Sequence, residues 1–541
     1  MATSAAITNL ATLVGAAKEV YAKLLEDIRV EETYFQENVK LDKQNLEGNF
    51  YHQPVALTQN CGQFFDVPDG SADMTNFPPV SMQTGDAQLK GYQLADRLRI
   101  TYEALSRLAN GEKASFINEN GLKMLSLWKS ARRNLELSIL YGSIGLGRVN
   151  VIGTITNGGT ANAQAPLTMD PNEWAPGMWI AAENKTLQFV GPAFGTVTYS
   201  GSSGAQTVVI GGVTASFTAG ASDALTAQAA LAAVQAVLGI SVQCYSQINT
   251  ATPTVLSLYS KDPNALGSVT TLTVTGTGAT ASGATFTVGA GVRGASAGKS
   301  VQVVSTIDDL SVPTLTVKNF NGVTDVVNAI TIGDVVFRSP EFGASPLGIQ
   351  YWLLATARGG IPGAAAGSNV VANISSTDYS AWRSSLVDLQ GKQLNFQRLF
   401  DAVSKAQDRG LDGRVVVAVG PKLYALLLSE AENTVNKDYS YKSSEFEGGF
   451  KGITVTSYTG EMELVPHRFV KRAQCYILPM DELVRIGSVD LVEKIGDDAE
   501  VSLQLDAPNG LYRELRLFTN QNFLIRAPAK CVMMINIGFP A

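Results

Sequence analysis

The chain has 541 residues, of which 45% are hydrophobic and 16% are charged, and its formal net charge is −7. This length and composition support roughly three or four domains of about 150 residues, each with its own core, and exclude wholesale disorder. The negative balance excludes a general electrostatic attraction to nucleic acid or anionic membranes, although it is compatible with a local basic patch.

The N-terminal segment lacks the sequence signals of export and of membrane insertion. Its first basic residue is Lys18, so the positive start of a signal peptide is missing, and no apolar run in the chain approaches the ~20 residues of a membrane span. Residues 9–28 have apolar side chains at helical spacing and charged ones on the opposite face. We predict an amphipathic helix that docks on its own fold or on a neighbouring subunit.

Residues 50–100 contain short apolar pieces without a helical period, interrupted by turn signals at 66–70 and 78–79. We interpret this segment as a long two-stranded arm. An arm of this kind has little core of its own and needs a partner surface to be stable.

The longest predicted helix runs from Lys113 to about Tyr141 and is stopped by Gly142. Its middle carries a cluster of basic residues, namely Lys123, Lys129, Arg132 and Arg133. One interpretation is a solvated face on which Glu136 pairs with Arg132 one turn away. The other is a surface that faces phosphate groups.

Four alternating segments, at 185–190, 301–307, 314–318 and 334–337, predict a small antiparallel barrel. Residues 191–290 interrupt them with only three charged side chains and with 70 positions that are Gly, Ala, Ser, Thr or Val. Such a sharp change of composition indicates a self-folding module inserted into a host domain. Within it we predict a hairpin at Gly211–Gly212 and a helix from Ser222, as N-cap, to Gly239.

After residue 346 the sequence returns to ordinary globular composition. A helix is predicted at 394–406, a second one at 422–430, and strands at 453–457, 462–465 and 475–478. The fully apolar run 415–419 predicts a strand that is covered on both faces. The apolar C-terminal run 531–535 indicates that the chain end completes a core.

The residues typical of enzymes are sparse. The two histidines, His52 and His467, have no partner at ligand spacing, and we expect both at a surface or an interface. The four cysteines are scattered singly, which favours buried free thiols in a reducing compartment: Cys61, Cys244, Cys475 and Cys531. Matches to nucleotide-binding and hydrolase patterns within 289–300 follow from the Gly, Ala and Ser content. The sequence therefore predicts no catalytic, cofactor-binding or metal-binding residues, and favours a structural subunit.

The order of these elements resembles that of the major capsid proteins of tailed double-stranded-DNA bacteriophages. The resemblance rests on six parts of the sequence: the arm 53–98, the helix end 134–142, the helix–strand–helix 396–430, and the segments 346–349, 465–470 and 522–526. It implies an α+β, Hong Kong 97-like phage capsid fold with an N-arm, an E-loop, a peripheral domain with a long spine helix, an axial domain and a β-rich insertion domain.

The resemblance also implies a division of the chain. We expect an N-terminal arm at 1–48, the E-loop at 49–100, the peripheral domain at 101–173, the insertion domain at 174–345 with the nested module at 191–295, a return segment at 346–390, the axial domain at 391–485, and the C-terminal strands of the peripheral domain at 486–541.

The function that the resemblance implies is structural. The chain would assemble as hexameric and pentameric capsomers into an icosahedral shell around packaged double-stranded DNA, which the basic patch on the long helix would face. Portal, scaffold and decoration proteins are the further expected partners, with no membrane and no cofactor, and the virion, assembled in the host cytoplasm, is the expected location. The alternatives are another virion part, such as a tail tube, sheath or fibre protein, and an unfamiliar enzyme.

Overall fold

The computed structural model describes the greater part of the chain. The described residues are 7–8, 32–43, 50–60, 80–101, 113–160, 162–180, 182–241, 243–248, 252–262, 270–289, 291–292, 300–308, 312–320, 326–360, 370–434, 453–457, 460–491, 503–506 and 512–539. The helix expected at 9–28 lies outside them. Among the described helices, none has both the length and the apolar character needed to cross a bilayer.

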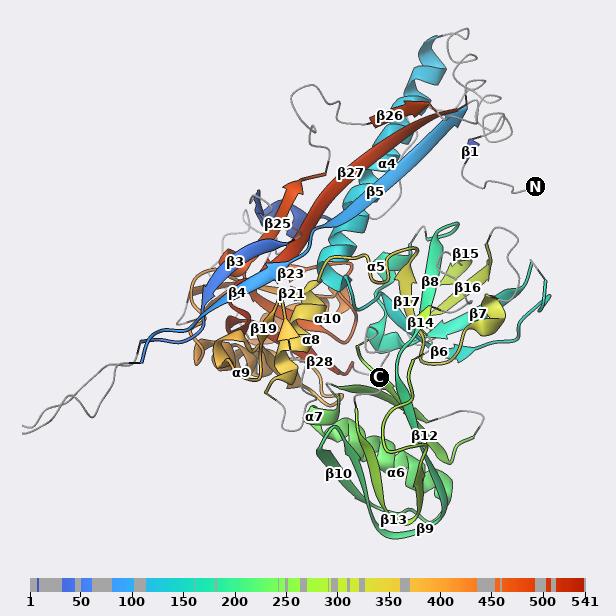
Figure 1. The fold of residues 1–541 in the computed structure, drawn as a ribbon, viewed down its shortest axis with the longest axis vertical. Coiled ribbons are helices and arrows are strands. Elements are labelled where there is room, and N and C mark those ends of the chain that lie inside the picture. Colours follow the sequence, from blue (N-terminus) through green and yellow to red (C-terminus); the bar gives the residue numbers. More distant parts are fainter. Residues whose placement is uncertain are drawn as a thin grey trace, which may run out of the picture.

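The long helix α4 spans Lys113–Tyr141, with the predicted bounds. Its C-terminal half is buried, and two long strands run beside it, β5 (Tyr92–Thr101) and β27 (Tyr512–Ile525) (Figure 1). They pair antiparallel from Tyr92 opposite Gln521 to Thr101 opposite Tyr512. The same sheet contains β1 (Ile7–Thr8), β2 (Leu41–Asp42), β25 (Leu483–Val489) and β26 (Leu503–Asp506).

The arm begins as an antiparallel hairpin of β3 (Tyr51–Ala56) and β4 (Thr84–Leu89) that leads away from the body (Figure 1). Its base is fixed where the Gln88 amide donates to the Ala372 carbonyl at 3.0 Å, beside the short strands β18 (Val370–Val371) and β19 (Ile374–Ser375). One detail of the expected E-loop, 49–100, is corrected. β5 does not project with the arm, because its whole length pairs with β27.

The predicted barrel is present, and the structure adds two strands to it. β6 (Gly147–Ile152) and β7 (Gln164–Met169) precede the expected start at residue 174. Strand β7 was not predicted because it contains Pro166, and proline is rare inside strands. The ring closes in the order β8–β15–β16–β7–β6–β17–β8. The other members are β8 (Thr186–Gly191), β15 (Val301–Ile307), β16 (Thr314–Asn319) and β17 (Val335–Arg338), and β14 (Gly291–Val292) pairs with β8.

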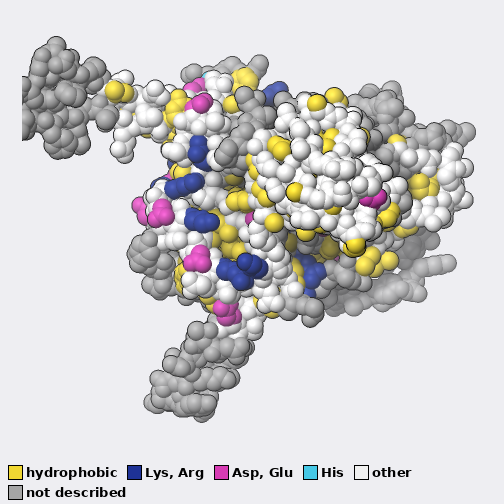
Figure 2. Space-filling view, turned by 90° about the horizontal axis from the view of Figure 1, so that it is seen from below, with side chains coloured by type: hydrophobic (Ala, Val, Ile, Leu, Met, Phe, Trp, Pro, Cys, Tyr) yellow, Lys and Arg dark blue, Asp and Glu magenta, His cyan; other side chains and the backbone are white. Residues whose placement is uncertain are grey.

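The charge-poor module has a sheet, a helix and a hydrophobic core of its own. The predicted hairpin turns at Gly211 and Gly212, both with positive φ, and Ser222 caps the helix by accepting from the Leu225 amide. The helix ends at Ala236, before Gly239, which lies in a separate short turn. The elements are β9 (Phe194–Ile210), β10 (Val213–Thr218), α6 (Asp223–Ala236), α7 (Leu238–Ser241), β11 (Cys244–Ile248), β12 (Val255–Ser260) and β13 (Leu272–Ala281). Figure 2 shows this lobe as almost uncharged, with Lys and Arg gathered on the neighbouring body.

The remaining sheet lies between two cores. Alternate residues of its central strand β21 (Val415–Val419) point into each core, which confirms the prediction of cover on both faces. Its other strands are β20 (Ser385–Asp388), β22 (Ile453–Ser457), β23 (Gly460–Pro466), β24 (Cys475–Pro479) and β28 (Val532–Ile535). The adjacent helices are α8 (Ile349–Arg358), α9 (Phe396–Gln407) and α10 (Pro421–Thr434).

The position of β28 corrects the expected C-terminal unit 486–541. Its residues pair with β20 and β24, so the chain end completes the sheet around β21 rather than the sheet around β27. All four residues of β28 are buried, in agreement with the prediction that the C-terminus completes a core.

We expect the module to be removable. Its two ends lie side by side, because Phe194 bridges to Thr287 and Gly191 pairs with Gly291. A chain in which a short Gly-Ser linker replaces 193–288 should keep the rest of the fold. All five tryptophans lie outside the module, so near-ultraviolet circular dichroism of the deletion variant should retain the tryptophan bands. Loss of those bands would show that the module is part of the host core.

Candidate functional site

Within the described residues, no group of three or more His, Cys, Asp or Glu side chains could hold a metal ion. Cys244, Cys475 and Cys531 are buried free thiols, and burial raises the pKa of Cys244 to about 12, so these thiols are protonated and unreactive at neutral pH. Cys61 lies outside the described residues. The polar groups that stand out instead join separate segments of the chain.

The most buried of these junctions is centred on Glu136, in the C-terminal half of α4. Its side chain is fully buried, and it accepts hydrogen bonds at 2.9 Å from the amides of Phe35 and Gln36, in the helix α2 (Tyr34–Asn38). His467 Nε2 lies 3.0 Å from Glu136 Oε1. One carboxylate therefore ties the end of the N-terminal segment, the long helix and the loop after β23 together.

This junction overturns two expectations. His467 is buried rather than at a surface, because it is packed between Phe35 and Phe469 and faces Glu136. Glu136 is not the partner of Arg132, because it points inward. Arg132 instead pairs with Glu37 and lies 4.6 Å from the centre of the Trp128 ring. His52 agrees with the expectation, since it is exposed on the arm, 2.6 Å from Asp86.

The structure separates the members of the expected basic patch. Arg133 is buried and donates to the carbonyls of Gly177 and Ile180, so it holds the short helix α5 (Pro176–Trp179) and does not belong to a surface patch. Lys129 and Arg132 are half-buried. The side chain of Lys123 lies outside the described part. A DNA-facing role for Lys123, Lys129 and Arg132 stays a prediction.

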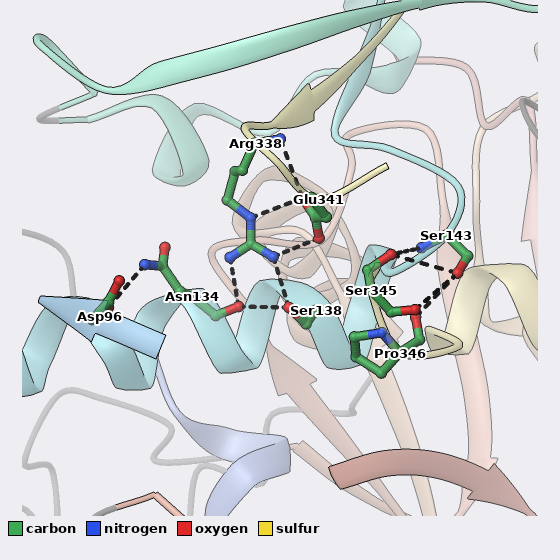
Figure 3. A network of polar contacts seen from close by, with 8 residues as sticks. All are labelled: Asp96, Asn134, Ser138, Ser143, Arg338, Glu341, Ser345 and Pro346. Carbon is green, nitrogen blue, oxygen red and sulfur yellow. Dashed lines mark hydrogen bonds and ion pairs between the residues drawn. The ribbon is translucent and has the colours of Figure 1, made fainter. Parts of the chain in front are cut away.

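A second polar network connects the barrel to the long helix (Figure 3). Arg338, at the end of β17, forms an ion pair with Glu341 at 2.6 Å and donates to the Asn134 carbonyl and the Ser138 hydroxyl of α4. Asn134 in turn donates to Asp96 of β5 at 3.2 Å. Burial raises the pKa of Asp96. The network thus fixes the barrel, the helix and β5 in one arrangement.

The end of α4 is locked separately. The Ser143 amide donates to the Ser345 hydroxyl at 2.8 Å, beside Pro346 (Figure 3). A side chain at Gly142 would lie 2.2 Å from the Pro346 carbonyl oxygen, so the close approach requires glycine. The chain that leaves the barrel therefore returns to the body at the point where the long helix stops.

A polar cavity of about 550 Å³ lies where the module meets the body. Charged side chains of both signs line it, namely Arg148, Asp170, Glu173, Lys261 and Lys471. Hydrogen bonds cross this junction from Ser241 to Asp388 at 2.8 Å, from Gln390 to the Ala236 carbonyl at 2.8 Å and from Gln247 to the Asn150 carbonyl at 3.1 Å. Arg358 of the body also forms an ion pair with Asp262 of the module at 3.4 Å. The module is thus joined to the body mainly through polar contacts.

Comparison with known proteins gives structural likenesses only. No protein-family model and no curated protein matches the chain. The capsid of cyanophage A-1(L) is similar at 9% identity and a TM-score of 0.45, over 96% of this chain and 97% of that one. The capsid of a native GTA particle is similar at 6% identity and a TM-score of 0.38, over 98% of this chain and 100% of that one. The capsid of cyanophage P-SCSP1u is similar at 6% identity and a TM-score of 0.37, over 96% of this chain and 93% of that one. These are capsid structures, the class that the sequence resembles, and the described elements have the expected α+β class.

Removal of the Glu136 carboxylate should destabilise the protein strongly. Glu136→Ala leaves two amides and His467 buried without an acceptor, and we expect it to lower the free energy of unfolding by about 3–5 kcal/mol. Glu136→Gln keeps an acceptor and should lower it by about 1 kcal/mol. Urea unfolding measures both values. The control is Glu37→Gln, at an exposed pair, for which we expect a change within about 1 kcal/mol. Equal losses in Glu136→Ala and Glu37→Gln would contradict this assignment.

The cavity gives a prediction on pH. Burial, followed by the negative charge of Glu173, raises the pKa of Asp170 to about 6. Between its ordinary range and pH 6, the folded state holds a proton that the unfolded state has lost, so the free energy of unfolding falls as the pH rises through this window, and the loss is complete above about pH 6. Asp170→Asn should be more stable than the wild type at about pH 8, and the advantage should shrink by about pH 5. If the difference in the free energy of unfolding between Asp170→Asn and the wild type were the same at pH 5 and pH 8, the prediction would be contradicted.

Proposed function

We propose that the chain is a major capsid protein. It assembles as hexameric and pentameric capsomers into a closed icosahedral shell that encloses packaged double-stranded DNA. The function is structural, and its site is the set of surfaces by which one copy holds the next.

The observation that carries this proposal is the arm. The β3–β4 hairpin starts from a base that packs into the main core through Tyr51, Ala87 and Leu89. Large apolar side chains just before β4 are exposed, with Val80 exposed to 60% and Met82 to 45%. This outer part of the arm is marginal in water unless another surface covers it. Obligate interfaces bury about 2,000–5,000 Å² in total, and a closed symmetric shell supplies such contacts around every subunit.

The body would connect these contacts through the long helix α4. The long helix is fixed at three places by buried or half-buried polar groups: by Glu136, by the Arg338 network, and by Ser345 at its end. An arm that pulls on one side of the subunit therefore transmits force through a single rigid element to the barrel and to the sheet around β21.

The further roles follow from the same proposal. The basic residues Lys123, Lys129 and Arg132 of the long helix would face the packaged DNA. The module would stand on the outer surface, where decoration proteins could bind, and portal and scaffold proteins would be the other partners. Assembly would take place in the host cytoplasm, with the virion as the final location.

We expect charged substitutions on the arm to prevent assembly. Val80→Asp combined with Met82→Asp should abolish particles that are seen for the wild type by sedimentation and negative-stain electron microscopy, because a charge cannot be buried unpaired. Ile307→Asp is the matched control, since Ile307 is an apolar residue of the barrel exposed to 58%. It should assemble normally. Assembly of the arm variant at the wild-type yield would contradict the proposed role of the arm.

A further inference from the structure

An apolar groove of about 390 Å³ lies between α5 and the start of α10, on the surface of the body. Its apolar side chains are Pro176, Ile180, Pro421, Leu423 and Val470. Ile180, at the edge of the groove, is exposed to 41%. Arg133 donates hydrogen bonds to the carbonyls of Gly177 and Ile180 and so fixes the side of the groove that α5 forms. The groove is therefore a fixed feature of the fold.

The rim of the groove is positively charged. Lys422, Arg468 and Arg472 line it, and Lys422 and Arg468 are exposed. The ammonium of Lys422 and the guanidinium of Arg472 lie 5.1 and 4.3 Å from the centre of the Phe539 ring. Glu32 is the nearby carboxylate, and the Arg468 backbone hydrogen-bonds to it. An occupant of this groove should combine apolar side chains with negative charge.

One segment of the chain has that composition. Between Lys43 and Lys90 there is no Lys or Arg, whereas five acidic residues are present: Glu47, Asp66, Asp69, Asp73 and Asp86. The arm tip, residues 61–79, contains three of these aspartates together with three phenylalanines, Phe64, Phe65 and Phe77. The tip is thus complementary to the groove in both charge and apolar character.

The direction of the strands at the base of the arm favours a tip from another copy. Figure 1 shows that β3 and β4 lead away from the body on the side opposite to α5. We propose that the groove between α5 and α10 receives the arm tip, residues 61–79, of a second copy of this chain, with its phenylalanines in the groove and its aspartates against Lys422, Arg468 and Arg472. This inference rests on the proposed function. It identifies the groove between α5 and α10 as the binding site of the arm tip, which we call the seat.

Carbodiimide cross-linking of purified particles tests the seat. The reagent joins a carboxylate to an amine in direct contact, with loss of water to the reagent. Among the described residues that line the groove, Lys422 is the one with a side-chain amine. Particles assembled from an equal mixture of ¹⁴N- and ¹⁵N-labelled subunits should yield peptides that join Lys422 to Asp66, Asp69 or Asp73. Pairs of mixed label show that the two partners come from different copies. Lys422→Arg is the matched control, and it should assemble normally but lose these peptides.

Charge exchange gives a second, independent test. Arg468→Glu with Arg472→Glu should lower the yield of particles at least tenfold, and Asp66→Lys with Asp69→Lys in the same chain should restore it at least partly. Near-ultraviolet circular dichroism establishes that each variant is folded.

The possible failures are distinguishable. Particles in which Lys422 is joined to the acidic residues of 9–28, or only to residues of its own copy, overturn the seat and leave the capsid function intact. The seat is also overturned if the folded variant that carries all four charge exchanges forms no more particles than the variant with Arg468→Glu and Arg472→Glu alone. A protein that forms no oligomer overturns the proposed function, and the seat with it.

Discussion

The fold depends most on one buried charge. Glu136 lies in the middle of the body without contact to water, and a buried carboxylate is tolerated only when its oxygens receive hydrogen bonds. The donors come from two segments that are distant in the sequence, the amides of α2 and the ring of His467. These bonds fix which face of the long helix points inward, and further bonds on the same helix hold the end of β17 and the chain that follows it.

A second constraint acts outside the body. The base of the β3–β4 hairpin packs into the main core through Tyr51, Ala87 and Leu89, whereas apolar side chains farther out are exposed, and the module has a core of its own and meets the rest through polar contacts. The two extensions are opposite in kind. The arm exposes apolar side chains at its outer part, whereas the module encloses its own apolar residues.

Much of the fold could be predicted from local sequence patterns. The bounds of α4 followed from its apolar stripe and Gly142, the turn of the module from Gly211 and Gly212, and the burial of β21 from its apolar run. Each of these signals lies within a few residues of the feature that it predicts. The same holds for the barrel strands with clear alternation, while β7 was missed because Pro166 interrupts its pattern.

The polar junctions could not be predicted, since they depend on partners far away in the chain. His467 and Glu136 are 331 positions apart, and Arg338 meets Ser138 across 200 positions. From the sequence, Arg133 and Arg132 are equivalent members of a basic cluster. The structure buries the first and leaves the second near the surface, because adjacent residues of a helix point about 100° apart. The groove between α5 and α10 joins segments about 250 positions apart, which no local pattern reveals.

The central claim, that this chain is the repeating unit of a closed shell held together by its arms, is tested most directly by cryo-electron microscopy of the purified protein at increasing concentration. The account predicts closed icosahedral particles in which the β3–β4 hairpin of each subunit lies on its neighbour. Tubes, or a discrete small oligomer in which the hairpins stay uncovered, would contradict it.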